Sequence, residues 1–132
     1  MASINFSNAL GVHASAMLLR ATRAEILANN LANADTPGFK ARDINFQAML
    51  AGEVASHQSL GVERTREGHL SGRRKADEDL LYRNPIQPSI DGNTVDSQIE
   101  QAIYSRNALS YTASFEFLSA KFKGMKGAIR GE

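Results

Sequence analysis

Two stretches of the chain, one near each end, repeat apolar residues at the alternating four- and three-residue spacing of a coiled coil. Side chains at this spacing stay on one side of a helix, so each stretch predicts a long helix with a continuous apolar stripe. Another helix must cover such a stripe, from the same chain or from a neighbour. The N-terminal stripe consists of Leu10, Ala14, Met17, Ala21, Ala24, Ala28 and Leu31, and the C-terminal one of Tyr104, Ala108, Tyr111, Phe115, Leu118, Phe122, Met125 and Ile129.

The N-terminal helix is predicted to begin near Ser7 or Asn8, either of which can cap free amide groups, and to run to about Asn33. Alanine dominates its stripe, so a partner helix can approach closely but gains little apolar surface to bury. Fixing each residue of the helix costs at least ~1 kcal/mol of backbone entropy. We therefore expect this helix to depend on packing against other helices.

The C-terminal helix is predicted to begin with Asn93 as its N-cap and to end at Gly131 after several basic residues. It carries a second apolar stripe, because Phe115 and Phe117 point ~200° apart around the helix axis. A helix that is apolar on two sides must be covered on both. We expect the N-terminal helix to cover one stripe and other chains to cover the other. The second stripe consists of Ile99, Ile103, Leu109, Ala113, Phe117 and Ala120.

A strong turn signal separates the first helix from the rest of the chain. Pro37 fixes its own φ and disfavours helix at Thr36, and Gly38 can adopt a positive φ. Residues 39–50 indicate an extended piece followed by a short amphipathic segment around Phe46 and Leu50.

Hydrophobic periodicity disappears over residues 51–91, where glycine and proline recur. We interpret this stretch as a long irregular connector with room for short extended pieces at 61–65 and 80–83. The chain is then one structural unit in three parts: residues 1–40 form the N-terminal helix and turn, 41–91 the connector, and 92–132 the C-terminal helix.

Composition narrows the functional class. With 132 residues, of which 42% are hydrophobic, the chain is the size of one domain with a modest core. A net charge of +1 gives no electrostatic reason to expect binding to nucleic acid or an anionic membrane. The absence of cysteine excludes disulfides and thiolate chemistry.

The chain also lacks an apolar run of the roughly 18 residues needed to span a bilayer. Ala14, Ser15 and Ala16 resemble a signal cleavage site, but no basic residue precedes them and polar residues interrupt the apolar region. We expect either a cytoplasmic protein or one exported without a cleaved signal.

Candidate catalytic chemistry is sparse. Glu63, Glu67 and His69, with His57 upstream, come nearest to a metal or acid–base cluster, but the three histidines lack paired metal-ligand spacing. Gly61 and Gly68 disfavour the helix that would align the two glutamates. We interpret this stretch as a solvated loop and predict no catalytic residue, metal site or cofactor.

Two polar features leave alternatives open. Asn29, Asn30 and Asn33 are poor helix formers that either cap a fraying helix end or form hydrogen bonds across a crowded helix junction. Tyr82 and Arg83 lie in an exposed-looking stretch, which we interpret as a plain loop, with a contact role as the alternative.

The sequence resembles bacterial flagellar basal-body rod proteins, which share a signature with hook proteins. Residues 27–40 carry this signature, and residues 41–46 and 91–96 extend the resemblance. It covers roughly residues 8–50 and 80–130; Phe39 and Ser97 depart from the usual tyrosine and methionine. The signature positions are Asn29, Asn30, Asn33, Thr36, Pro37 and Gly38.

This resemblance implies a structural role. The two terminal helices of such proteins form the inner layer of a hollow tube, the periplasmic rod that transmits torque from the membrane ring to the hook. Implied partners are copies of the chain, other rod proteins, the rod-to-ring adaptor protein and, in transit, the flagellar export gate. The resemblance implies export without signal cleavage, no direct membrane span and no nucleic acid.

Early substrates of that export route are expected, from the resemblance, to carry a Phe-x-x-x-apolar motif. Phe46 with Leu50 fits this pattern, and so does Phe6 with Leu10. We prefer the first pair because it adjoins the signature.

We therefore predict a mainly α-helical, non-enzymatic protein whose terminal helices pair antiparallel, are joined by a long irregular connector, and become ordered by assembly. The short chain favours a proximal rod subunit over a distal one, because distal members carry larger central domains. The alternatives are another rod-family subunit, a soluble dimeric coiled-coil adaptor or export chaperone, and a metal-dependent enzyme using Glu67 and His69.

Overall fold

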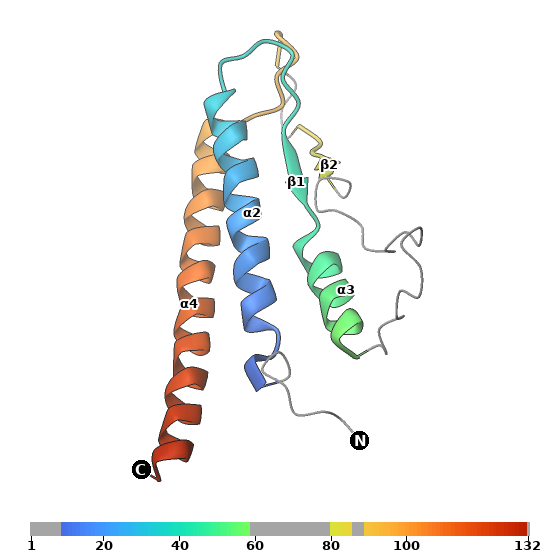
Figure 1. Cartoon of the computed structure of the whole chain (residues 1–132). Helices are drawn as coiled ribbons and strands as arrows, with labels where there is room; N and C mark the ends of the chain where they lie inside the picture. Colours follow the sequence, from blue (N-terminus) through green and yellow to red (C-terminus); the bar gives the residue numbers. More distant parts are fainter. Residues whose placement is uncertain (1–8, 59–79, 86–88, 132) are drawn as a thin grey trace, which may run out of the picture.

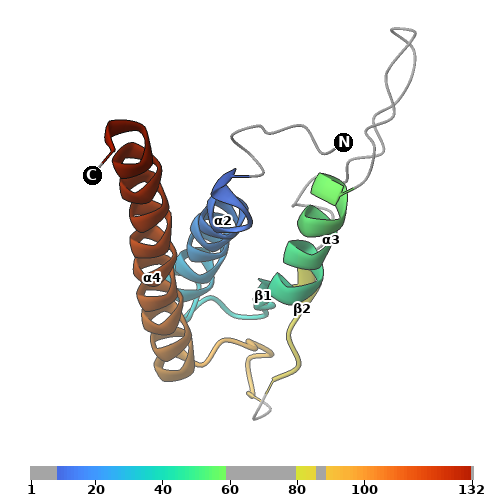
Figure 2. The ribbon, with the colours of Figure 1, turned by 90° about the horizontal axis from the view of Figure 1, so that it is seen from below.

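Two long helices lie side by side along most of the molecule (Figure 1). The computed structural model describes residues 9–58, 80–85 and 89–131. The elements in chain order are α2 (His13–Ala32), β1 (Arg42–Ile44), α3 (Phe46–Gln58), β2 (Leu80–Tyr82) and α4 (Ser97–Arg130). Seen along the helices, α2 lies between α4 on one side and α3 with the β-strands on the other (Figure 2).

Helices α2 and α4 are antiparallel. The side chain of Asn107 donates a hydrogen bond to the carbonyl of Arg20, whereas Lys121 lies within 3.5 Å of the carbonyl oxygen of Ala9. Residue numbers therefore rise along α4 as they fall along α2. This arrangement confirms the predicted mainly helical fold with paired terminal helices.

The two helices differ in length. α2 has 20 residues and α4 has 34, which correspond to ~30 and ~51 Å of helix. His13, the first residue of α2, lies against Phe117 with ring centroids 5.4 Å apart. The last turns of α4 therefore project beyond α2.

The first helix is not continuous from its predicted start. Ser7 and Asn8 lie outside the described residues, and the helix that includes Ala9 and Leu10 is interrupted at Gly11, whose φ is +64°. A residue in this left-handed region cannot continue a right-handed helix, so α2 begins only at His13. Its end at Ala32, with Asn33 as C-cap, agrees with the prediction to within a residue.

The predicted N-cap of the second helix is also wrong. The carboxylate of Asp96 caps α4 by accepting hydrogen bonds from the backbone amides of Gln98 (3.0 Å) and Ile99 (3.2 Å). Asn93 lies outside the helix and has another role, described below. The predicted end at Gly131 is confirmed, because this residue has a φ of +77° and its amide bonds the carbonyl of Gly127.

The middle of the chain is more regular than predicted. β1 and β2 pair antiparallel, with Asp43 opposite Leu81, so the extended piece expected at residues 80–83 is confirmed for Leu80–Tyr82. The expected irregular structure from residue 51 is wrong up to Gln58, because α3 continues through Gly52, where nothing crowds the helix. The pieces expected at residues 61–65 lie outside the described residues.

The described interior contains few apolar side chains. Four apolar residues are buried, whereas five polar or charged residues are equally buried. Three of these polar residues follow one another at seven-residue intervals on the face of α4 that meets α2. The expectation that α2 would cover a complete apolar stripe of α4 is therefore wrong. The buried apolar residues are Ala16, Leu27, Ala41 and Ile44, and the buried polar ones are Asn30, Asn93, Glu100, Asn107 and Ser114.

Candidate functional site

The end of α2 is held by a side chain from the segment that leads into α4. The carbonyl groups of the turn that follows α2 lie outside the helix and need partners from elsewhere. Asn93, which is 6% exposed, directs its side-chain amide nitrogen to the carbonyl oxygens of Asn33 (3.1 Å), Ala34 (2.6 Å) and Thr36 (3.0 Å). Its side-chain oxygen accepts from the amide of Val95 at 2.8 Å. Asn93 therefore fixes the turn after α2 to the start of α4.

Backbone hydrogen bonds join the same two segments. The amide of Gly38 donates to the carbonyl of Asp91 at 2.9 Å, and the amide of Thr94 donates to Phe39 at 3.0 Å. The hydroxyl of Thr94 also accepts from the amide of Ala41 at 2.8 Å. The signature residues 36–40 and the segment 91–94 thus form one junction, at the end of the helix pair opposite the C-terminus (Figure 1).

The three signature asparagines divide between the two roles considered for them. Asn30 is 1% exposed and makes two hydrogen bonds to the backbone of Arg42, donating to its carbonyl at 2.7 Å and accepting from its amide at 3.1 Å. It therefore ties α2 to β1 across the junction. Asn33 donates instead to the carbonyl of Asn29 at 2.8 Å, which is a local cap of the helix end.

Replacing Asn93 by alanine should lower the free energy of unfolding by about 2–3 kcal/mol, because it removes two amide donors and one acceptor worth roughly 1 kcal/mol each. Replacement by aspartate should cost more, since a carboxylate cannot donate and would face three carbonyl oxygens. Urea unfolding followed by circular dichroism measures both effects. Exposed Asn84, replaced by alanine, is the control. An aspartate variant as stable as the alanine variant would contradict this role.

A cluster of four charged side chains connects α4 to α2 and the strands. Arg23 donates two hydrogen bonds to the carboxylate of Asp43, at 2.8 and 2.7 Å. Arg83, just after β2, reaches the same carboxylate at 3.0 Å and also pairs with Glu100 on α4. The cluster therefore contains two arginines and two carboxylates from four parts of the chain.

Burial shapes the electrostatics of this cluster. Burial raises the pKa of Glu100, whose side chain is 1% exposed, and the Arg83 guanidinium opposes that rise. Burial also acts to raise the pKa of Asp43, but hydrogen bonds from Arg23 and Arg83 lower it overall. Glu100 consequently depends on Arg83 for compensation of its charge. The interpretation of Arg83 as part of a plain loop is wrong, because the loop lies against α4 at this point.

The apolar stripes of both helices remain partly or fully exposed in the single chain. In the N-terminal stripe, Ala21 and Ala28 are exposed and the other residues are half-buried. On α4, Phe115 is 52%, Phe122 47% and Ile129 87% exposed. The half-buried residues of the predicted seam are Leu10, Ala14, Met17, Ala24, Leu31, Leu118 and Met125, and Tyr111 is exposed with the phenylalanines.

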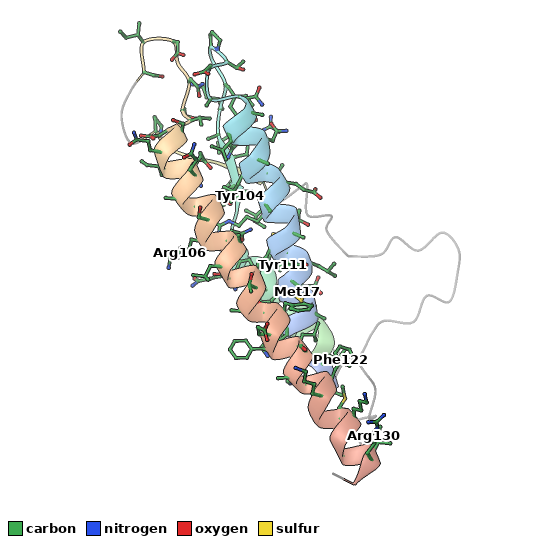
Figure 3. All side chains as sticks on the ribbon, turned by 90° about the vertical axis from the view of Figure 1, so that its left-hand side faces the viewer. Met17, Tyr104, Arg106, Tyr111, Phe122 and Arg130 are labelled. Atoms are coloured by element: carbon green, nitrogen blue, oxygen red, sulfur yellow. The ribbon has the colours of Figure 1, made fainter. Side chains whose placement is uncertain are left out.

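The exposed part of α4 includes the turns beyond α2. A surface hollow of about 280 Å³ is lined by aromatic and aliphatic side chains together with Lys123 and Lys126. Figure 3 shows Phe122 and Arg130 on this projecting part of the helix. An exposed aromatic surface flanked by cations is suited to contact another protein rather than water.

The preferred export motif lies at the start of α3. The guanidinium of Arg20 stacks over the ring of Phe46 at 4.4 Å from its centroid, so this ring is half-buried against α2. Leu50 lines a shallow apolar hollow on α3. Phe6 of the other candidate motif lies outside the described residues.

No catalytic centre emerges from the part of the chain that the structure describes. Within residues 9–58, 80–85 and 89–131, no group of three or more histidine or acidic side chains is placed to hold a metal ion. Glu63, Glu67 and His69 lie outside these ranges, and the side chain of His57 is not described. None of the described helices is both long and apolar enough to cross a membrane.

The chain has a helix pair with an uncovered aromatic surface and a hydrogen-bonded junction at one end. These features suit a structural subunit that packs against neighbouring subunits. Residues 10–40 match the family described as flagella basal body rod protein. The class is thus that of the flagellar basal-body rod proteins.

Comparison over the whole chain narrows this class. Proteins described as flagellar basal body rod protein FlgB are 48% identical in Aeromonas hydrophila, 43% in Cereibacter sphaeroides and 40% in Salmonella typhimurium. These matches cover 98%, 96% and 93% of this chain, and 98%, 98% and 94% of the relatives. The chain belongs to the FlgB family of flagellar rod proteins. It is a structural, non-enzymatic component of the basal-body rod and assembles with other rod subunits.

Proposed function

We propose that the chain is a structural subunit of the proximal rod, which transmits torque from the membrane ring to the hook. The observation that supports this role most directly is the exposed aromatic surface of α4. Among the buried residues that the structure describes, polar ones outnumber apolar ones. Such a molecule buries much of its apolar surface only against neighbours, and their binding then stabilises the fold by mass action. Ordering of the terminal helices by assembly follows from the same argument.

The proposed neighbours are copies of the chain, other rod proteins and the rod-to-ring adaptor protein, within the periplasmic rod. The apolar stripes of α2 and α4 are the proposed assembly seam, and the junction around Asn93 keeps the two helices in register for it. Residues 1–40, 41–91 and 92–132 would act as one unit, because hydrogen bonds from Asn30, Asn93 and Arg83 link all three parts.

Transit through the flagellar export gate, without signal cleavage, is the proposed route to the rod. Phe46 and Leu50 are the proposed recognition residues. Because Arg20 covers the ring of Phe46 in the folded chain, recognition of this motif would require α3 to leave α2. Export of an unfolded chain satisfies that requirement, and refolding on assembly would cover Phe46 again.

A deletion strain tests the proposed function. We expect loss of swimming with no rod or hook assembled beyond the basal ring, and recovery when the intact chain is supplied on a plasmid. Electron microscopy of isolated basal bodies shows where assembly stops. Normal filaments in the deletion strain would refute a role in the proximal rod.

A further inference from the structure

An open groove runs between α2 and α4 on the side where Tyr104 and Tyr111 lie (Figure 3). Its volume is about 380 Å³, and the two tyrosines are 40% and 38% exposed. Small side chains form much of the rest of its wall, so a third helix can approach closely. The lining residues are Arg20, Ala21, Ala24, Tyr104, Asn107, Ala108, Tyr111 and Thr112.

The groove contains an unpartnered hydrogen-bond acceptor. Asn107 is 4% exposed, and its side-chain nitrogen donates to the carbonyl of Arg20 at 2.8 Å. Its Oδ1 is buried and has no partner among the described residues. A buried amide oxygen without a donor costs roughly 1–3 kcal/mol. A donor that entered the groove would remove this cost.

The opposite flank of α4 supplies a donor of the required kind. Arg106 is exposed and lies two residues from Tyr104, so it points ~200° away around the helix axis. Figure 3 shows the two side chains on opposite sides of α4. Ala102, Leu109 and Ala113 share the flank of Arg106 at helical spacing, and Leu109 is 72% exposed. This flank is a narrow apolar ridge that carries one guanidinium.

We propose that the groove between α2 and α4 binds the Arg106 flank of a second copy of this chain. The guanidinium of that copy lies over the rings of Tyr104 and Tyr111 and donates to Oδ1 of Asn107, while its alanines pack against Ala21 and Ala24. A guanidinium over an aromatic face and a charge-assisted hydrogen bond are both favourable in a partly desolvated groove.

The position of groove and ridge on opposite flanks determines the symmetry of the contact. A two-fold contact would bring the same surface of both copies together, whereas this contact joins two different surfaces. Each copy therefore keeps one free groove or one free ridge, and further copies can be added around a ring or helix. The proposal rests on the proposed role in a tubular rod and specifies which surfaces of neighbouring copies meet there.

The test uses purified full-length chains with single cysteines, because the natural sequence has none. Ala24→Cys marks the groove and Ala102→Cys marks the ridge. The hydrogen bond from Asn107 to the carbonyl of Arg20 places these two residues opposite each other on the antiparallel helices. Ala24 therefore lies roughly opposite residue 103. A short bismaleimide reagent should crosslink the two variants when they are mixed and leave each variant alone uncrosslinked.

Adding Arg106→Ala to the ridge-marked chain should lower the yield of mixed dimer about tenfold, as expected for loss of one charge-assisted contact. Arg42→Ala, which removes the same charge from an exposed position on β1, should leave the yield unchanged. The proposal is overturned by absence of mixed dimer, by equal crosslinking of either variant alone, or by equal effects of the two arginine substitutions. None of these results bears on the deletion strain, which tests the rod function separately.

Discussion

Replacing Arg83 by methionine should destabilise the folded chain by roughly 3 kcal/mol or more. The substitution leaves the carboxylate of Glu100 buried at 1% exposure without its charge partner, and removing one member of a buried pair typically costs ~3–5 kcal/mol. The lower end of this energy range applies because the Arg83 side chain is itself 25% exposed. Urea unfolding monitored by circular dichroism measures the loss.

The control for this prediction removes the stranded charge. Adding Glu100→Gln to Arg83→Met should recover a large part of the lost stability, because the amide has similar shape and no charge. If the double variant is as unstable as Arg83→Met, the loss comes from packing of the arginine stem and not from the charge of Glu100.

The pH dependence of stability is a second test of whether the buried charge of Glu100 causes the loss in Arg83→Met. Burial raises the pKa of Glu100 and Arg83 opposes the rise, so without Arg83 the pKa should rise further. The folded variant then binds a proton at a pH where the unfolded chain does not, and the loss of stability should shrink as the pH falls from neutrality toward the ordinary pKa of a glutamate. Asp43 behaves in the opposite way, because its pKa is lowered in the folded chain. Its contribution to stability is complete above the ordinary pKa of an aspartate and is lost only as the pH falls below that value.

Periodicity predicted the long elements because it records a property of each helix alone. A stripe at coiled-coil spacing indicates helix whatever lies against it, and Gly131 ends α4 through its own left-handed φ. The same local reasoning failed for Asn93 and Asp96, which are both good capping residues three positions apart. The choice between them depends on the carbonyls of the turn after α2, about 60 residues away in sequence, which Asn93 reaches.

The charged cluster could not be predicted from local pattern, because it joins four parts of the chain. A weak signal was nevertheless present. Glu100, Asn107 and Ser114 repeat at seven-residue intervals along α4, and this polar row is the face that meets α2. Periodicity predicts apolar residues at the same spacing for this contact, because burial usually favours apolar side chains. In the single chain they stay exposed or only half-buried, as expected of residues that other molecules cover.

Replacing Phe122 by aspartate should abolish swimming while leaving the isolated chain folded. The ring is 47% exposed on the part of α4 that projects beyond α2, so a carboxylate there is solvated in the single chain. In an assembly that covers this surface, the substitution removes about 1.5–3 kcal/mol of apolar burial and adds the cost of desolvating a charge. A total of at least ~3 kcal/mol weakens each contact more than a hundredfold, and every copy carries the defect. Motility assays and basal-body microscopy measure the loss, and Phe122→Leu should swim nearly normally. Swimming by the aspartate variant would show that this surface stays exposed to water in the rod.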